Sequence, residues 1–581
     1  MTANILIEKD VMVRMRDGVA LATDVYRPDD GQKHPVLVMK SPYDKDDFWV
    51  VHELICSPLE GAVRNYAMVI ASDRGRFKSE GIWRFGHEGV DAYDMVEWAA
   101  AQDWSDGNVG LYGNCALGYA PWFGAIEQPP HLKAIFSYVS NANFHEGWTY
   151  TTGGAFNLGF NLPWVGFIGT DTLSRMGLPP GELADLLATL AEVSNLGNTP
   201  AETAARLPRH LPLVDLPAAT RLDYWHEWLV HPSYDKFWQD RDGVALADRI
   251  QVPVLHATGW YDICAKGHVK MQHALMTHPD ERVRRESRFV VGPWDHSAYY
   301  NHRETFSGER DFGVATGPRW LAPMIFEWFD HWLKGKDATF MPGESKVHYF
   351  QMGENVWKDA EEWPPAHTKV EYHLHSRGRA NSRFGDGALS LEAPDTEPVD
   401  SYVYDPLDPV VSVGGQTMMM TSGVWDQAAS EERQDILVYT TPRLASPVAI
   451  AGPVTVTLFA ASDAPDTDFT AKLVDVEPDG YCANITEGIV RARYRHGTDR
   501  EEFLNPGEVT EFEIELYDTA HTFLEGHCIR LEIASSNFPV FDRNLNSRVT
   551  PALGTAEDAR KAAQQVFHDA DRPSRLILPV V

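Results

Sequence analysis

A thiol at position 115 lies in a sequence setting typical of catalytic nucleophiles. An apolar run over residues 108–112 is followed by Gly113, Asn114 and Cys115, and a further glycine, Gly118, comes three residues after the thiol. This spacing predicts a tight strand-to-helix turn that presents the side chain at its tip, and the neighbours must be small because the turn is strained. We expect Cys115 to be the nucleophile, at a position where a serine would be usual.

A carboxylate and an imidazole follow in the order nucleophile, acid, histidine. Asp262 ends the segment 256–262, and His296 follows the next apolar stretch at residues 288–291. Both side chains are expected at the carboxyl ends of strands, where α/β sites are built. We expect His296 to take the proton of the thiol and return it to the leaving group, and Asp262 to fix the tautomer of His296.

The remaining parts of the site follow less directly from the pattern. The backbone N–H of Ala116 is one expected oxyanion donor, because it directly follows the nucleophile in the elbow. No paired spacing typical of a metal site occurs, so neither a metal nor an organic cofactor is expected. Scattered cysteines predict a reducing, cytoplasmic location. Four of them are expected to be small buried hydrophobic residues: Cys56, Cys264, Cys482 and Cys528.

Short apolar strands alternate with helical patterns in the first third of the chain, which favours a parallel α/β sheet. The expected elements are strands at residues 36–39, 66–70, 134–136, 252–256 and 288–291, and a helix at 89–101 with Val90, Tyr93, Val96 and Ala100 on one face. A helical segment between the third and fourth of these strands predicts an inserted cap over the site.

The last part of the chain has a different period. Residues 454–458, 512–516 and 529–533 alternate apolar and polar side chains, and turn signals separate them. This pattern predicts an all-β jelly-roll sandwich. The expected organisation is an α/β-hydrolase domain in two parts (1–141 and 249–350), a helical cap (142–248) and a jelly-roll domain (351–581).

Charge excludes two classes of partner. The chain of 581 residues has 51 Lys and Arg against 83 Asp and Glu, a net charge of −32. Such a surface repels nucleic acid and anionic membranes, so a small-molecule substrate is the expected partner. No apolar run reaches about 18 residues, and the first ten residues lack the apolar region of a secretory signal.

Several motifs resemble the CocE/NonD family of hydrolases, which includes cocaine esterases and X-prolyl dipeptidyl aminopeptidases. The resemblance covers nearly the whole chain. Its motifs are Ser41-Pro42-Tyr43-Asp44-Lys45, Asp73-Arg74-Gly75 with Ser79-Glu80-Gly81, Asp106-Gly107-Asn108-Val109-Gly110, Gly259-Trp260-Tyr261-Asp262, Gly292-Pro293-Trp294 with His296-Ser297, Asp466-Thr467-Asp468-Phe469 and Ser535-Ser536-Asn537-Phe538-Pro539.

The resemblance implies the same three-part fold and adds roles that the pattern alone does not give. It implies that the hydroxyl of Tyr43 is the second oxyanion donor. It also implies an aromatic and apolar acyl pocket formed by Trp148, Trp164, Met418, Met419 and Met420. A homodimer is compatible with the resemblance. Two departures are the cysteine at position 115 in place of serine, and alanine at position 116, where the family often has tyrosine.

Three functions are compatible with the thiol. The first is hydrolysis of an ester or amide of a small hydrophobic acyl compound through a covalent acyl-enzyme. The second is acyl transfer or another biosynthetic reaction, because a thioester reacts more readily with amines and thiols, relative to water, than an oxygen ester does. The third is a binding protein on a hydrolase scaffold. The sequence does not distinguish a natural Cys115 from a replaced serine.

Overall fold

The computed structural model describes residues 4–47, 56–86, 88–206, 210–296, 305–317, 321–337, 345–418 and 420–581. Its first large element is a ten-stranded sheet that is parallel through its centre and antiparallel at both edges. The strands, in spatial order, are β1 (Ile5–Arg14), β2 (Ala20–Pro28), β4 (Ala67–Ser72), β3 (His34–Ser41), β5 (Ser105–Asn114), β6 (Leu132–Tyr138), β7 (Val254–Tyr261), β8 (Arg288–Asp295), β11 (Val347–Gln351) and β12 (Val356–Ala360).

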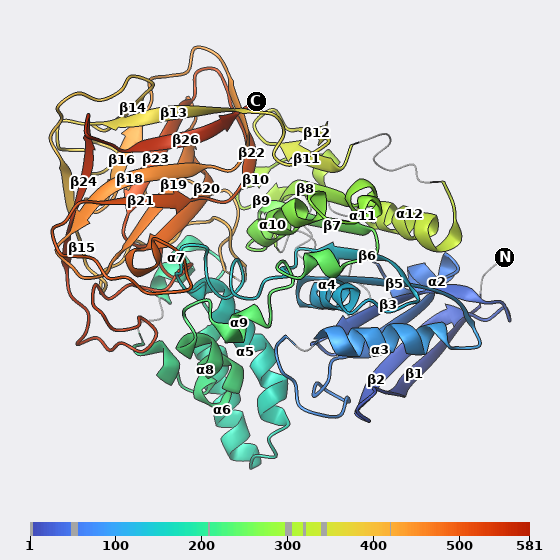
Figure 1. Cartoon of the computed structure of the whole chain (residues 1–581). Helices are drawn as coiled ribbons and strands as arrows, with labels where there is room; N and C mark the ends of the chain where they lie inside the picture. Colours follow the sequence, from blue (N-terminus) through green and yellow to red (C-terminus); the bar gives the residue numbers. More distant parts are fainter. Residues whose placement is uncertain are drawn as a thin grey trace.

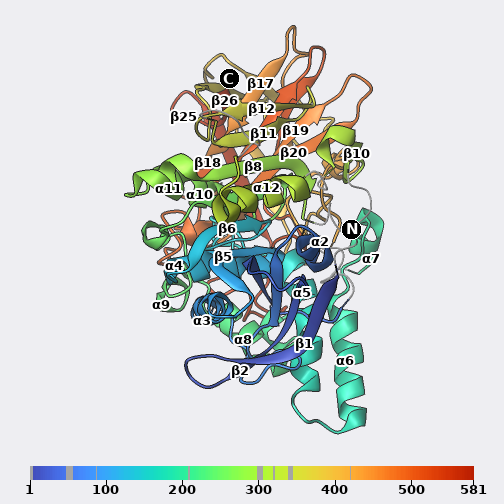
Figure 2. The same ribbon diagram turned by 90° about the vertical axis from the view of Figure 1, so that its right-hand side faces the viewer.

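Helices cover both faces of this sheet, as the side chains of β5 require. Gly110 packs closely against Phe329 on one face, because a Cβ atom on Gly110 would lie 2.6 Å from that ring. Leu111 points to the other face and packs against Gly124, where a Cβ atom would lie 2.7 Å from the Leu111 side chain. Figure 2 shows α3 and α4 on one side of the central strands and α12 on the other. The helices of this part are α2 (Pro58–Val63), α3 (Glu88–Ala100), α4 (Tyr119–Ile126), α10 (Ala265–Met276), α11 (Glu281–Glu286) and α12 (Leu321–Lys334).

A helical cap is inserted between β6 and β7. The chain enters and leaves it at one place, because Gly243 N donates to Ala142 O at 2.7 Å and Asn143 Nδ2 donates to Asp242 Oδ2 at 2.9 Å. In Figure 1 the cap lies below the C-terminal sandwich and beside the sheet. Its helices are α5 (Leu158–Ser174), α6 (Pro180–Ser194), α7 (Pro200–Ala205), α8 (Asp223–Val230) and α9 (Lys236–Gln239).

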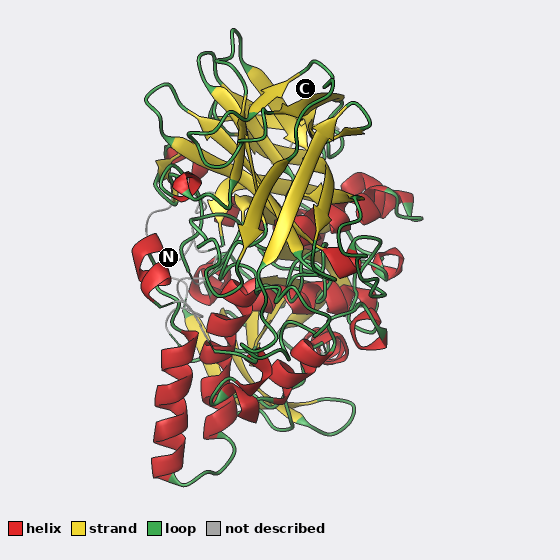
Figure 3. Ribbon diagram, turned by 90° about the vertical axis from the view of Figure 1, so that its left-hand side faces the viewer, coloured by secondary structure: helices red, strands yellow, loops and turns green. Residues whose placement is uncertain are grey.

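The C-terminal part is the expected jelly-roll β-sandwich, and no α-helix follows Lys334 among the described residues. Figure 3 shows its strands as a block beside the helical parts. The strands are β13 (Thr368–His375), β14 (Ala388–Ser390), β15 (Asp400–Tyr404), β16 (Leu437–Thr440), β17 (Val448–Gly452), β18 (Thr455–Ser462), β19 (Asp468–Val476), β20 (Cys482–Arg491), β21 (Thr510–Glu515), β22 (Thr519–Phe523), β23 (Cys528–Ala534), β24 (Ala562–Asp569), β25 (Arg572–Pro573) and β26 (Arg575–Val580). A small separate hairpin, β9 (Phe306–Ser307) with β10 (Arg310–Asp311), precedes it.

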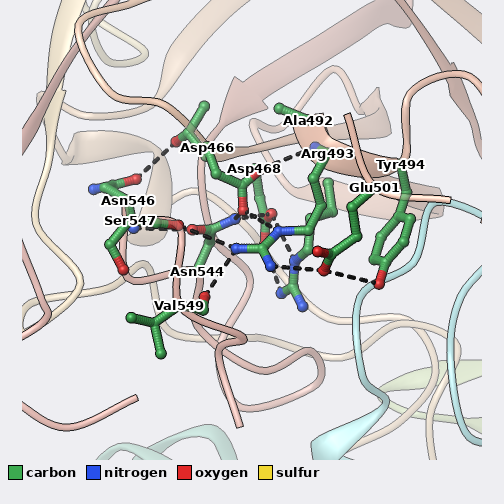
Figure 4. A network of polar contacts seen from close by, with 12 residues as sticks. Asp466, Asp468, Ala492, Arg493, Tyr494, Glu501, Asn544, Asn546, Ser547 and Val549 are labelled. Carbon is green, nitrogen blue, oxygen red and sulfur yellow. Dashed lines mark hydrogen bonds and ion pairs between the residues drawn. The ribbon is translucent and has the colours of Figure 1, made fainter. Parts of the chain in front are cut away.

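A buried charge network holds the sandwich together next to the cap (Figure 4). Arg491 donates to Asp468 at 3.0 Å and to Asp542 at 2.7 Å, while Arg493 donates to Asp466 at 2.8 Å. Asp542 also accepts a hydrogen bond from the backbone N–H of Phe156 at 2.9 Å. Each guanidinium therefore has carboxylate partners, which offsets the cost of burying its charge, and the network fixes the segment that leads into α5.

Two details of the sequence prediction are wrong. Val90 is 42% exposed, while Glu88 and Asp91 lie on the buried face of α3. Asp91 pairs with the partly exposed Arg74 at 2.7 Å and lies 3.9 Å from the buried Lys40, so the helix buries charge where the apolar pattern predicted Val90. The boundary at residue 350 falls inside the β11–β12 hairpin, so the catalytic sheet continues to Ala360.

Candidate active site

Cys115 is at the tip of a strained turn between β5 and α4. Its φ angle is 53°, in the left-handed region, and a short 3₁₀ turn, Cys115–Gly118, leads into the helix. A Cβ atom on Gly113 would lie 2.2 Å from Leu117 O, and one on Gly118 would lie 2.5 Å from Ser140. The structure therefore forms the predicted elbow, and it shows why glycine is required on both sides of the thiol.

Asp262 and His296 come together at the carboxyl ends of β7 and β8. Nδ1 of His296 lies 2.7 Å from Asp262 Oδ1, and both side chains are fully buried. Two further donors hold the carboxylate: Thr258 Oγ1 at 2.6 Å and the backbone N–H of Cys264 at 3.1 Å. A carboxylate with three partners has a fixed orientation, so His296 Nδ1 carries the proton and Nε2 faces the other way.

The electrostatics of His296 link it to the thiol. Burial lowers the pKa of His296, but Cys115 and Asp262 more than offset this, so that the pKa is raised well above its ordinary value. Nε2 of His296 is buried and makes no hydrogen bond of ordinary length within the described part of the chain. The imidazole can therefore accept a proton on the side that faces Cys115 and remain stabilised by Asp262.

Tyr43 approaches the thiol from the loop after β3. Its hydroxyl lies 3.8 Å from Cys115 Sγ and accepts a hydrogen bond from Trp164 Nε1 at 2.9 Å. The backbone N–H of Tyr43 is held by Ser41 Oγ at 3.0 Å. Ala116 directly follows Cys115 and is 3% exposed. Of the two predicted oxyanion donors, the Tyr43 hydroxyl thus lies beside the sulfur, and Ala116 is the next residue along the chain.

The predicted pocket residues come from two different parts of the chain. Trp148 and Trp164 belong to the cap, and their rings meet edge-on with centroids 5.2 Å apart. Met420 comes from the sandwich and reaches α5, because a Cβ atom on Gly159 would lie 2.5 Å from its sulfur. Met418 is half-buried and packs against the same core, and Met419 lies outside the described residues.

Comparison with known proteins identifies the family of the chain. Residues 17–298 match the X-Pro dipeptidyl-peptidase (S15 family), and residues 340–577 match the X-Pro dipeptidyl-peptidase C-terminal non-catalytic domain. The chain is 36% identical over 590 residues to the cocaine esterase of Rhodococcus sp. (strain MB1 Bresler), covering 100% of this chain and 99% of that protein. The chain belongs to the CocE/NonD hydrolase family.

Solved structures support the same fold for this CocE/NonD hydrolase. An aminopeptidase from the marine sediment archaeon Thaumarchaeota archaeon matches with a TM-score of 0.82 at 26% identity, covering 100% of this chain and 97% of that chain. A CocE/NonD family hydrolase from Staphylococcus aureus matches with a TM-score of 0.71 at 19% identity, covering 99% and 94%, a likeness of fold alone. The protein is an α/β-hydrolase-family enzyme of the esterase and peptidase type.

The aromatic cluster around the predicted pocket residues Trp148 and Trp164 contains more rings than the sequence predicted. Trp228 stacks on Trp164 with centroids 5.8 Å apart, and Tyr119 meets Trp148 edge-on at 5.1 Å. Several ring donors in this cluster are buried and have no hydrogen-bond partner within the described part of the chain: Trp83 Nε1, Tyr119 Oη, Trp148 Nε1 and Trp228 Nε1. Sequence alone could not select these residues, because aromatic side chains are most often core residues.

One cysteine expected to be merely structural is a close neighbour of the acid and the base. Potential ligand atoms of Asp262, Cys264 and His296 lie within 4.8 Å of one another. Asp262 and His296 are hydrogen-bonded to each other, and the thiol of Cys264 lies beside this pair. Burial raises the pKa of the Cys264 thiol, so it stays protonated. Its position two residues after Asp262 was the signal available in the sequence.

The neighbouring histidines form a separate chain of hydrogen bonds. Ser140 N donates to His268 Nε2 at 2.9 Å, His268 Nδ1 lies 3.0 Å from His256 Nδ1, and His256 Nε2 lies 3.0 Å from Gln272 Oε1. Burial lowers the pKa of both His256 and His268, so these rings stay neutral. Both rings thus have structural hydrogen-bond partners. No helix in the described ranges is both long and apolar enough to cross a bilayer.

Proposed function

We propose that this hydrolase cleaves an ester or amide of a small hydrophobic acyl compound through Cys115, His296 and Asp262, with a covalent acyl-enzyme. One arrangement supports the proposal. The thiol at the strained elbow lies 3.8 Å from the Tyr43 hydroxyl and interacts electrostatically with the imidazole of His296, whose Nδ1 is held by Asp262 at 2.7 Å. Nucleophile, base, orienting acid and oxyanion donor are thus in one place.

In the first half-reaction, His296 Nε2 takes the proton of Cys115, and Asp262 stabilises the resulting imidazolium. The thiolate attacks the carbonyl carbon, so a C–S bond forms and the carbonyl π electrons move to oxygen. The Tyr43 hydroxyl and the backbone N–H of Ala116 donate to this oxyanion. Collapse of the intermediate breaks the bond to the alcohol or amine, which leaves with the proton from His296 and gives a thioester on Cys115.

In the second half-reaction, water attacks the thioester. His296 removes a proton from the water as its oxygen bonds to the carbonyl carbon, and the same donors hold the oxyanion. The C–S bond then breaks, the free acid leaves, and the thiolate is regenerated beside protonated His296. The proton from Cys115 leaves with the alcohol or amine, and the proton from water stays on His296 beside the regenerated thiolate. The cycle therefore balances without a cofactor.

The walls of the site support a hydrophobic acyl group. Trp148 and Trp164 are at most 1% exposed, and Met420 from the sandwich belongs to the same hydrophobic core. An apolar acyl group would gain by leaving water there, whereas a charged one would lose its hydration without a counter-ion. Unpartnered ring donors such as Tyr119 Oη would also suit an acyl group with one hydrogen-bond acceptor.

The test is the turnover of an aryl ester and an aryl amide by the wild type, Cys115→Ala and Cys115→Ser. We expect Cys115→Ala to lose turnover and Cys115→Ser to keep part of it, because a hydroxyl can use the same base. Turnover by Cys115→Ala equal to that of the wild type would rule out the proposal. Adding a primary amine tests acyl transfer: a product that is mainly the amide, rather than free acid, would make the enzyme a transferase.

A further inference from the structure

Arg76 is a buried cation that joins the Tyr43 loop to cap helix α5. Its guanidinium donates through Nε to Pro42 O at 2.8 Å, and through Nη2 and Nη1 to Ile168 O at 3.0 Å and Thr172 Oγ1 at 2.9 Å. Pro42 directly precedes Tyr43, and Ile168 and Thr172 belong to the helix that carries Trp164. One side chain thus spans the two elements that meet at the oxyanion donor.

The same two elements are joined a second time at the site itself. Trp164 Nε1 donates to the Tyr43 hydroxyl at 2.9 Å, and that hydroxyl lies 3.8 Å from Cys115 Sγ. Hydrogen bonds at Pro42 and at Tyr43 therefore connect neighbouring residues of the loop to one helix. Two bonds to one rigid helix fix both the position and the direction of a side chain better than one bond can.

The buried charge of Arg76 is satisfied mainly by neutral oxygens and not by a close carboxylate. The side chain is 1% exposed, and its nearest carboxylate, Asp171, lies 3.6 Å away, so carbonyl and hydroxyl oxygens supply most of its contacts. A buried charge is expensive unless it is closely paired. The next residue, Phe77, has a φ angle of 47°, a region that bulky residues rarely adopt. Strain of this kind gathers at functional sites.

We propose that Arg76 is a positioning residue that holds the Tyr43 hydroxyl opposite the carbonyl oxygen during acylation and deacylation of Cys115. The inference rests on the proposed function, because it assigns Arg76 a role only through Tyr43. Arg76 forms hydrogen bonds to the loop and to α5 and makes no chemical contact with the reacting atoms. Its loss should lower kcat more than it raises KM, since oxyanion stabilisation acts in the transition state.

The experiment is a double-mutant cycle of Arg76→Met with Tyr43→Phe, using kcat and KM for one aryl ester. We expect Tyr43→Phe alone to lower kcat about 100-fold, as for loss of an oxyanion donor. Arg76→Met alone should lower it about tenfold, the scale of a misplaced group. In the Tyr43→Phe background the Arg76 substitution should lower kcat less than about twofold, because the group that it positions is already absent.

Arg74→Met is the matched control. Arg74 lies two residues away and pairs with Asp91 at 2.7 Å and Asp17 at 2.6 Å. The substitution Arg74→Met therefore removes the same charge from the same turn as Arg76→Met does. We expect kcat within about twofold of the wild type, as for a substitution away from the site. Arg76→Lys keeps the charge but not the planar fork, and should lie between the wild type and Arg76→Met.

The outcomes separate the two proposals. An equal loss of kcat from Arg76→Met in both Tyr43 backgrounds, or a change in KM alone, overturns the role of Arg76 and leaves the proposed function standing. An unchanged kcat in Tyr43→Phe overturns the oxyanion assignment and the role of Arg76 together. If Arg76→Met does not fold, Thr172→Val removes one acceptor of the guanidinium and takes its place in the cycle, with about threefold expected in kcat.

Discussion

Two buried histidines in this molecule have similar partners and opposite consequences. His296 in the catalytic part and His568 in the sandwich are 0% and 1% exposed, and each faces a carboxylate. His296 has Asp262 at one nitrogen and no hydrogen bond of ordinary length at the other within the described ranges. His568 has Glu397 at 3.0 Å from Nδ1 and Asp400 at 2.9 Å from Nε2.

The sandwich site even contains a serine, but its geometry prevents catalysis of the acyl-transfer type. Ser376 Oγ lies 3.1 Å from His568 Nε2, yet it donates to Asp400 at 2.7 Å and accepts from Gly378 N at 2.9 Å. Burial lowers the pKa of His568, but Asp400 and Glu397 raise it above its ordinary value overall. His568 is therefore a structural cation. The presence of a serine, a histidine and a carboxylate is therefore not enough for a catalytic triad. The histidine also needs a nitrogen that is free to accept a proton from a strained nucleophile beside it.

The largest expected effect comes from the catalytic histidine. His296→Asn removes the only base near Cys115 in the described structure, so kcat/KM for an aryl ester should fall at least about 10⁴-fold. Steady-state kinetics with folded protein measures it. His568→Asn is the matched control and should stay within about threefold of the wild type below its unfolding temperature. Equal losses in the two variants would contradict the distinction between the sites.

The next effect is that of the orienting acid. Asp262→Asn keeps the shape of the site but places a neutral amide beside His296 Nδ1. The amide no longer stabilises the imidazolium. We expect kcat to fall about 10³- to 10⁴-fold. Steady-state kinetics of Asp262→Asn measures this loss. Asp400→Asn, the corresponding substitution next to His568, is the control and should leave kcat nearly unchanged in folded protein. A normal kcat for Asp262→Asn would show that His296 needs no carboxylate.

The free energy of unfolding should depend on the histidine of the sandwich, His568, whereas activity depends on His296. A raised pKa of His568 in the folded state means that its stabilising contribution is full below its ordinary value of 6.5 and is lost as pH rises through the folded pKa. His568→Asn leaves Asp400 and Glu397 without this cation and should cost about 3 kcal/mol at pH 6, with a smaller cost at higher pH. Chemical denaturation of both proteins from pH 6 to 9 measures the difference. A difference that grows with pH would contradict the assignment.

The smallest effect concerns the support of the acid. Thr258 donates to Asp262 at 2.6 Å, and Thr258→Val removes this bond while keeping the shape of the side chain. The backbone N–H of Cys264 still holds the carboxylate at 3.1 Å. We expect a loss of about three- to tenfold in kcat, measured with the same aryl ester. A loss as large as that of Asp262→Asn would mean that Thr258 takes part in the chemistry itself.

The sequence was sufficient for the parts of the site that have a local signal. Glycines around Cys115 predict the elbow because the turn excludes other side chains, and Asp262 and His296 follow apolar strands whose ends meet in any parallel sheet. Arg76 has no such signal, since its partners Pro42, Ile168 and Thr172 are distant in the chain. Thr258 is only four residues before Asp262, but the pattern does not show that its hydroxyl meets the carboxylate. The exposure of Val90 on α3 has a similar cause: the cations that face the buried Asp91, Arg74 and Lys40, lie elsewhere in the chain.

Rapid quenching followed by peptide mass spectrometry tests the central claim most directly. The wild-type enzyme is mixed with an activated aryl ester, quenched with acid within one turnover and digested. The account predicts an added acyl mass on the peptide that contains Cys115, and no added mass on the peptide that contains Ser376. Turnover of the ester without any acyl mass on Cys115, or with the mass on another residue, would contradict it.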